Sequence, residues 1–224
     1  WTYGELQARV GQLAMGLIHL GIEPGDRVGI WGPNSSEWVL VQLATAKIGA
    51  IMVCINPAYR LYELEYALNK VECKTLITDV SFKTSDYLGM INILAPELES
   101  SHPGQLEAEK LPHLTHVIRM GSDTTPGMYN FDAVSAAGTD DDQATMDALQ
   151  GRLQPDDAIN IQFTSGTTGN PKGATLSHCN ILNNGFLTGL AMQLGPEDKL
   201  CIPVPLYHCF GMVLANLACL THGA

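Results

Sequence analysis

The sequence predicts an α/β fold in which a mostly parallel β-sheet is flanked by helices. Three short strand-like segments, 27–31, 51–55 and 75–78, alternate with two helix-like segments. The segment 51–55 is apolar at every position, as is typical of a strand buried on both faces. Because a strand–helix–strand unit joins two parallel strands by a right-handed crossover, this alternation indicates a parallel sheet with helices on both sides. With 224 residues, 46% of them hydrophobic, the chain can bury a substantial core.

The first predicted element is an amphipathic helix that begins after Thr2. Thr2 and Glu5 have the spacing of a capping box, and apolar residues then recur at helical spacing as far as Leu20. Gly21 can end this helix, and the Pro-Gly-Asp sequence at 24–26 is a turn that leads into the first strand.

The remaining elements follow from hydrophobic periodicity and from the turn residues between them. Helices are expected over the segments 35–48, 61–71, 85–95, 144–149, 179–194 and 210–220. Later strands are expected over 115–120, 158–163, 174–177 and 199–204. The segment 121–157 is acidic and irregular, so we expect a surface insertion between a first α/β lobe, 1–120, and a second lobe, 158–224.

The most informative segment is 163–173, which reads Phe-Thr-Ser-Gly-Thr-Thr-Gly-Asn-Pro-Lys-Gly. Its glycines permit positive φ angles and close approach to a ligand, while four hydroxyls and one ammonium group supply hydrogen-bond donors. A Walker A loop runs from a strand into a helix and keeps glycine next to lysine, whereas this segment lies between two strand-like segments. We expect a nucleotide phosphate loop of another kind, and the alternative is a polar surface hairpin.

This segment resembles the signature loop of the adenylate-forming superfamily, which includes acyl-CoA synthetases, luciferases and the adenylation domains of peptide synthetases. The match runs without gaps from Thr164 to Gly173. Three further segments, 2–6, 46–57 and 205–211, resemble conserved blocks of the family in the expected order. The family's later motifs, including the C-terminal catalytic lysine, are not found. The resemblance therefore implies an incomplete N-terminal part of the large adenylate-forming domain.

The resemblance also implies two sets of site residues. The set that binds the phosphates of ATP is Thr164, Ser165, Gly166, Thr167, Thr168, Gly169, Lys172 and Gly173. The set that lines the acyl or substrate pocket is Tyr207, His208, Phe210 and Gly211. For His208 and Phe210 the alternative is an ordinary place in the core. No catalytic residue is assigned within these 224 residues. No metal ligand is assigned either, because the aspartates at 140–142 have the pattern of a solvated charge run.

The chemistry that the resemblance implies has two steps and uses ATP, Mg²⁺ and coenzyme A. A carboxylate attacks the α-phosphorus of ATP to give an acyl-adenylate and pyrophosphate, and the thiol of coenzyme A then takes the acyl group. The 205–211 block lacks the aspartate that pairs with an amino-acid ammonium group in peptide synthetases, so an apolar acid fits better, and the chain resembles the medium-chain fatty acyl-CoA ligases. An aryl-acid ligase and a non-catalytic nucleotide-binding domain are the alternatives, and the 224 residues alone are expected to be inactive.

The composition also limits which other partners and which cellular compartment are expected. A net charge of −11 argues against nucleic acid and against an anionic membrane surface, since both require clustered Lys and Arg. The apolar stretches 38–55 and 200–220 are interrupted by polar residues and prolines, so no transmembrane segment is expected. Six cysteines without a Cys-x-x-Cys pair indicate a reducing compartment, either the cytoplasm or the mitochondrial matrix. The oligomeric state is left open.

Overall fold

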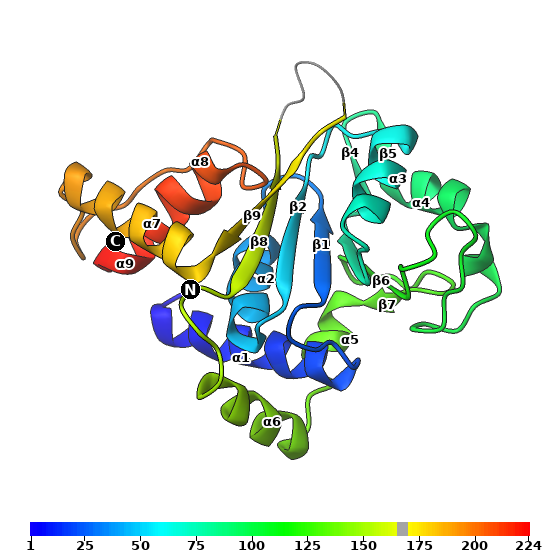
Figure 1. Ribbon diagram of the computed structural model, residues 1–224, viewed down its shortest axis with the longest axis horizontal. Helices are drawn as coiled ribbons and strands as arrows, with labels where there is room; N and C mark the ends of the chain where they lie inside the picture. The colour runs from blue at the N-terminus through cyan, green and yellow to red at the C-terminus, as the bar shows by residue number, and fades with distance from the viewer. Residues whose placement is uncertain (165–169) are drawn as a thin grey trace.

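The computed structural model describes residues 1–164 and 170–224, and it confirms the predicted α/β fold (Figure 1). Among these residues, one sheet of seven strands has the order β7-β6-β3-β1-β2-β8-β9. Neighbouring strands run parallel except for β8 and β9, which form an antiparallel pair at one edge. A separate two-stranded hairpin is formed by β4 and β5.

The strands and helices have the following bounds. The strands are β1 (Arg27–Trp31), β2 (Ile51–Ile55), β3 (Thr75–Thr78), β4 (Ser81–Phe82), β5 (Ser85–Asp86), β6 (His116–Arg119), β7 (Tyr129–Asn130), β8 (Ala158–Phe163) and β9 (Gly173–Ser177). The helices are α1 (Tyr3–His19), α2 (Ser36–Ile48), α3 (Leu61–Lys70), α4 (Tyr87–Leu94), α5 (Phe131–Ser135), α6 (Asp140–Gln150), α7 (His178–Met192), α8 (Cys209–Gly211) and α9 (Ala218–His222). A 3₁₀-helix covers Pro96–Glu99, and a π-helix, Met212–Leu217, joins α8 to α9.

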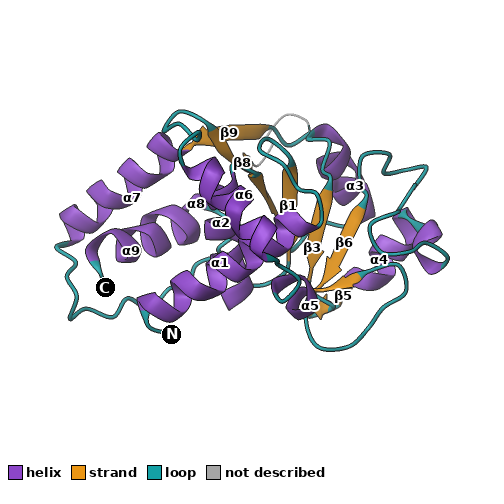
Figure 2. Cartoon of the chain, turned by 90° about the horizontal axis from the view of Figure 1, so that it is seen from below, coloured by secondary structure: helices purple, strands orange, loops and turns teal. Residues whose placement is uncertain are grey.

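The sheet separates two hydrophobic cores, because alternate side chains of a strand point to opposite faces. Met52 and Cys54 of β2 enter the core beneath α1, α2 and α7, whereas Val53 and Ile55 enter the core beneath α3 and α4. Figure 2 shows these two groups of helices on opposite sides of the strands. The fully apolar sequence of β2 is therefore explained by burial on both faces.

The local signals at the ends of the first two helices are confirmed, with one difference. Thr2 and Glu5 form the predicted capping box, in which Thr2 Oγ1 accepts from the Glu5 backbone N–H at 3.2 Å. Gly21 follows α1 with a φ of 77°. Ser35 is the N-cap of α2, but its side chain makes no capping hydrogen bond.

The strand predicted over 199–204 is wrong, because this segment has no regular structure. Pro203 and Pro205 lack the N–H groups that a ladder requires. The carbonyl of Val204 accepts a hydrogen bond from the Asn34 side chain at 2.9 Å instead of from a neighbouring strand. The segment is therefore held by side-chain contacts rather than by sheet pairing.

The division of the chain into lobes at 120 and 157 stays a prediction, but its middle segment is more ordered than expected. The short helix predicted over 144–149 is the C-terminal part of α6, which begins at Asp140. The aspartates occupy the first turn, where a helix dipole favours negative charge. Phe131 and Val134 of α5 and Met146 of α6 are buried in the core next to α1. The segment thus contributes apolar side chains to the core.

None of the helices in the described part of the chain is long and apolar enough to cross a membrane.

The contact between α1 and α5 predicts opposite effects for two glycine-to-alanine substitutions on the same helix. A Cβ atom at Gly16 would overlap the backbone carbonyl of Val134, whereas nothing lies within 4 Å of the position that a Cβ would take at Gly11. We expect Gly16→Ala to lower the free energy of unfolding by about 1–3 kcal/mol through overpacking. Gly11→Ala should raise it by up to about 1 kcal/mol, since alanine is the better helix former. Urea unfolding of both variants checks this, and equal effects would contradict the packing of α5 on α1.

Candidate functional site

Four parallel strands end at the same edge of the sheet. Trp31 of β1 is level with Ile55 of β2 and with Thr78 of β3, and Cys54 of β2 is level with Gln162 of β8. The strand order switches direction at β1. The chain passes from β1 to β2 on one side of it, and then continues with β3 and β6 on the other side. Open α/β sheets bind ligands outside the carboxyl ends of their strands at such a point.

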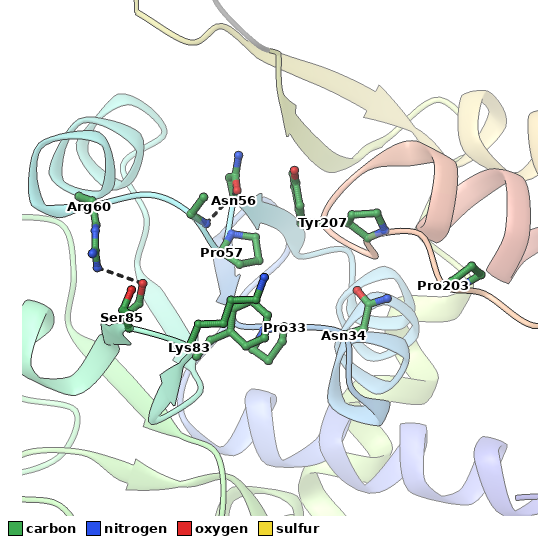
Figure 3. A pocket seen from close by; sticks show the side chains of 13 residues that line it. Pro33, Asn34, Asn56, Pro57, Arg60, Lys83, Ser85, Pro203 and Tyr207 are labelled. Atoms are coloured by element: carbon green, nitrogen blue, oxygen red, sulfur yellow. Dashed lines mark hydrogen bonds between the residues drawn. The ribbon is translucent and has the colours of Figure 1, made fainter.

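A cavity of about 770 Å³ lies at this edge (Figure 3). Its lining comes from the segments 33–34 after β1, 56–60 after β2, 82–85 after β3, and 203–207 before α8. The size is within the range of sites that hold small molecules. The cavity thus unites segments from both ends of the chain.

Asn34 joins the C-terminal segment to the loop that follows β1. Its Nδ2 donates to the carbonyl of Val204 at 2.9 Å, and its Oδ1 accepts from the backbone N–H of Leu206 at 2.8 Å. Because both ends of one carboxamide are used, the backbone before Tyr207 is fixed in place. Tyr207 consequently lines the cavity.

Two cationic side chains line another part of the cavity, and in Figure 3 both lie away from Tyr207. Arg60 donates from Nη1 to the hydroxyl of Ser85 at 3.0 Å. Lys83 has a φ of 55°, in the left-handed region, and its Nζ lies 5.1 Å from the centre of the Phe82 ring. The described residues that line the cavity include no carboxylate. In a chain with a net charge of −11, this part of the surface therefore favours an anion.

The glycine- and threonine-rich loop begins at the same edge of the sheet. β8 and β9 flank it, so it joins two strands as predicted, and the backbone N–H of Thr164 donates to the carbonyl of Lys172 at 2.9 Å. This bond closes the base of the loop. Thr164 and Lys172 are exposed. The predicted phosphate-binding residues Ser165, Gly166, Thr167, Thr168 and Gly169 lie outside the described residues.

Helix α3 contacts the end of the loop that leads into β9. The hydroxyl of Tyr66 donates to the carbonyl of Pro171 at 3.3 Å, and the hydroxyl of Tyr62 donates to Asn170 Oδ1 at 3.4 Å. Gly173 pairs with Phe163 in the ladder, and a Cβ there would come within 3.0 Å of the Ile161 side chain. The glycine therefore permits close packing on β8.

The four residues predicted for the acyl pocket have different positions. Tyr207 is half-buried in the cavity lining, whereas His208 is exposed and its Nδ1 accepts from the Phe210 backbone N–H at 3.1 Å, which caps α8. The Phe210 side chain is 55% exposed, so the alternative of core packing does not apply to it. Gly211 is buried where a Cβ would come within 2.5 Å of the Pro205 carbonyl oxygen.

The thiols of Cys54 and Cys209 are not activated. Burial raises the pKa of Cys54 to about 12 and raises the pKa of Cys209 above its usual value. Both groups therefore stay protonated near neutral pH and are poor nucleophiles. In the ranges 1–164 and 170–224, no group of three or more His, Cys, Asp or Glu side chains could hold a metal ion.

Sequence reasoning missed Asn34, Arg60 and Lys83. Asn34 follows a strand and precedes a helix N-cap, which is a common place for asparagine in a turn. Arg60 lies next to the Asn-Pro pair of the 46–57 block, and that proximity was the available signal. Lys83 is one of 12 Lys and Arg residues, and nothing in its local sequence distinguishes it.

Comparison with solved structures gives the same fold. ATP-bound MatB from Rhodopseudomonas palustris matches 99% of this chain and 38% of its own, with 29% identity and a TM-score of 0.73. The anthranilate CoA ligase AuaEII, solved in complex with anthranoyl-AMP, matches 98% of this chain and 38% of its own, with a TM-score of 0.79 and 24% identity. At that identity the second likeness supports the fold alone.

Comparison with known sequences is more specific. The medium-chain acyl-CoA ligase ACSF2, mitochondrial, of Rattus norvegicus is 46% identical over 227 aligned residues, which cover all of this chain. The chain spans 37% of the length of that relative. The model of the AMP-binding enzyme family matches residues 1–224. The chain has a strand–loop–strand element at the edge of a parallel sheet with a cavity beside it, and the family model matches its whole length. This chain therefore belongs to the AMP-binding enzymes.

Proposed function

We propose that the parent protein is an AMP-forming acid–thiol ligase that activates a fatty acid, of medium chain length, to an acyl-adenylate and then to acyl-CoA. The observation that carries this proposal is the shared sheet edge. The loop after β8 and the cavity over β1, β2 and β3 open at the same ends of parallel strands. Two substrates bound there would lie close enough to react.

In the first step, the loop residues bind and orient the phosphates of ATP. The hydroxyl of Thr164 and the ammonium group of Lys172 are exposed at the base of the loop. Lys172 is the sole Lys or Arg between Leu153 and Asp198 in the sequence, so it supplies the positive side-chain charge of this region. Ser165, Thr167 and Thr168 would add hydroxyl donors, and Gly166, Gly169 and Gly173 would permit backbone approach.

Mg²⁺ would arrive with ATP and offset its charge. The described residues supply no cluster of ligands for it, so its protein contacts are not assigned to this chain.

The acid would bind at Tyr207, His208, Phe210 and Gly211. An ammonium group here would have no carboxylate partner among the residues that line the cavity, and an unpaired buried charge is strongly disfavoured. An apolar acid avoids that penalty, and the 46% identity to a medium-chain acyl-CoA ligase supports a fatty one. A ligase for aryl acids is the second candidate, and a non-catalytic nucleotide-binding domain is the third. Pyrophosphate exchange with a panel of acids separates the three.

Coenzyme A is the proposed acyl acceptor, and its phosphates would bind at Arg60 and Lys83. A nucleotide with several phosphates needs more than one cation, and these two side chains line the same cavity as Tyr207. The mitochondrial relatives support the matrix as the site of action in a eukaryote, and the cytoplasm is the site otherwise.

The role of Lys172 predicts a selective loss. In the full-length parent, Lys172→Ala should lower kcat/KM for ATP–pyrophosphate exchange by about 100-fold, because a donor to the transition-state charge is removed. Thr168→Val should lower it by about tenfold through the loss of one hydrogen bond. Thioester formation from preformed acyl-adenylate and coenzyme A should change much less. The exposed Lys199, replaced by alanine, is the matched control, and equal loss in both half-reactions would contradict the role.

The cationic part of the cavity, at Arg60 and Lys83, predicts a loss in coenzyme A binding rather than in adenylate formation. Arg60→Ala and Lys83→Ala should each raise the KM for coenzyme A by about fivefold, since a charge-assisted contact to phosphate contributes about 1 kcal/mol in a partly solvated site. Pyrophosphate exchange should stay within twofold of the wild type. Lys70→Ala, at the exposed end of α3, controls for the loss of one positive charge. If the variant that combines Arg60→Ala with Lys83→Ala has an unchanged KM for coenzyme A, these two residues do not bind its phosphates.

The 224 residues alone should form no appreciable acyl-CoA from ATP, Mg²⁺, octanoate and coenzyme A, because they span about 37% of the length of their relatives. Turnover by the purified chain, measured by thioester formation, would refute this.

A further inference from the structure

The helix that follows the 205–211 block contains a π-turn. Residues 209–211 and 218–222 are α-helical, but Met212–Leu217 has π-helical bonding, which inserts an extra residue into the turn. Such turns are rare and are found most often near functional sites. A specific constraint must therefore favour this one.

Close packing fixes both ends of this helix. At its start, Gly211 lies against the carbonyl oxygen of Pro205, where a Cβ would come within 2.5 Å. At its end, a Cβ on Gly185 of α7 would come within 2.7 Å of the Leu217 Cβ, and one on Gly189 would overlap the ring of His222. Because both ends are closely packed, the π-turn takes up the extra residue between them.

The buried side chain of Gln42, on α2, contacts the π-turn at two residues, Met212 and Asn216. Gln42 is 5% exposed, and its Oε1 accepts from Asn216 Nδ2 at 2.7 Å. Its Nε2 lies 3.5 Å from the carbonyl oxygen of Met212, which it reaches as a donor. In a regular α-helix that carbonyl would accept from the backbone N–H of residue 216. Gln42 therefore bonds to the backbone of the first residue of the π-turn and to the side chain of Asn216, four residues later.

The π-turn also contacts β8, the strand that leads into the glycine- and threonine-rich loop. The sulfur of Met212 lies 3.7 Å from Cys54 Sγ and 3.7 Å from Asn160 Nδ2. Gln162 donates to Asn160 Oδ1 at 3.1 Å and lies two residues before Thr164. The π-turn is thus packed between α2 and the base of the loop.

The surroundings give the π-turn room to rearrange. A mostly apolar cavity of about 120 Å³ lies beside it, lined by Gln42, Asn160 and Leu217 among others. If the amide pair were lost, the turn could relax into this space and revert toward an α-helix. The 205–211 block, which leads into this helix, would then shift relative to β8.

We propose that Gln42 is a positioning residue of the acid-binding site. With Asn216 it maintains the π-turn, and the π-turn sets the position of the 205–211 block relative to β8. Gln42 does not line the cavity that Tyr207 lines, so it acts through the π-turn. The inference rests on the proposed function, since it assigns the selectivity for acids to this arrangement.

The test uses the full-length parent and four variants: Gln42→Leu, Asn216→Leu, the double variant, and Thr45→Val. Pyrophosphate exchange is measured with straight-chain acids of four to twelve carbons, and thermal unfolding is measured alongside. Each single variant should lower kcat/KM for the preferred acid by about tenfold and change the ratio between short and long acids, while the KM for ATP stays within twofold. In the double variant the melting temperature should recover, since both polar partners are gone. The altered acid profile should persist.

Thr45→Val is the matched control. Thr45 is fully buried on the same helix, but its hydroxyl donates to the Val41 carbonyl at 2.7 Å and so bonds within α2. This variant should keep the wild-type acid profile. A wild-type profile in the double variant, or a KM for ATP that rises together with the KM for the acid, would overturn the positioning role. A wild-type parent that shows no exchange with any acid would instead overturn the proposed function, and the inference with it.

Discussion

The parallel register of β1, β2, β3 and β8 is the constraint on which the rest of the structure depends. Because these strands run in the same direction and end level with one another, the loops that leave them meet at one edge. The cavity, Arg60, Lys83 and the glycine- and threonine-rich loop are all consequences of that shared edge. The register is stabilised by burial, since a slip of one residue would exchange the side chains of the two cores.

The antiparallel edge pair gives the loop a different kind of support. A phosphate loop between a strand and a helix is oriented by the helix N-terminus. Here β8 and β9 hold both ends of the loop through ladder pairing, and α3 adds the two tyrosine contacts. Thr164 and Lys172, at its base, are both exposed.

Buried polar side chains connect this loop to the helix that follows the 205–211 block. Asn160 and Gln162 of β8, Gln42 of α2 and Asn216 are all buried, and each has a partner. A buried amide that loses its partner destabilises the fold, so such a network allows few arrangements of the elements that carry it. The network therefore specifies geometry beneath the site, where apolar packing alone would tolerate small shifts.

The sequence by itself determined the fold class, the bounds of β1, β2, β3 and β8, the capping box of α1 and the strand–loop–strand context of the glycine- and threonine-rich loop. Each of these depends on neighbours in the chain, such as the apolar run of β2 or the spacing of Thr2 and Glu5. Only the tertiary structure decided that Asn34 bonds to Val204 and Leu206, that Lys83 joins Arg60 at the cavity, and that Gln42 meets Asn216. The hydrogen bonds of Asn34 and Gln42 join residues 170 to 174 positions apart, and no local pattern encodes them. The predicted strand over 199–204 failed partly for a local reason, since Pro203 and Pro205 lack the N–H groups that a ladder requires, and the bond from Asn34 to Val204 replaces pairing there.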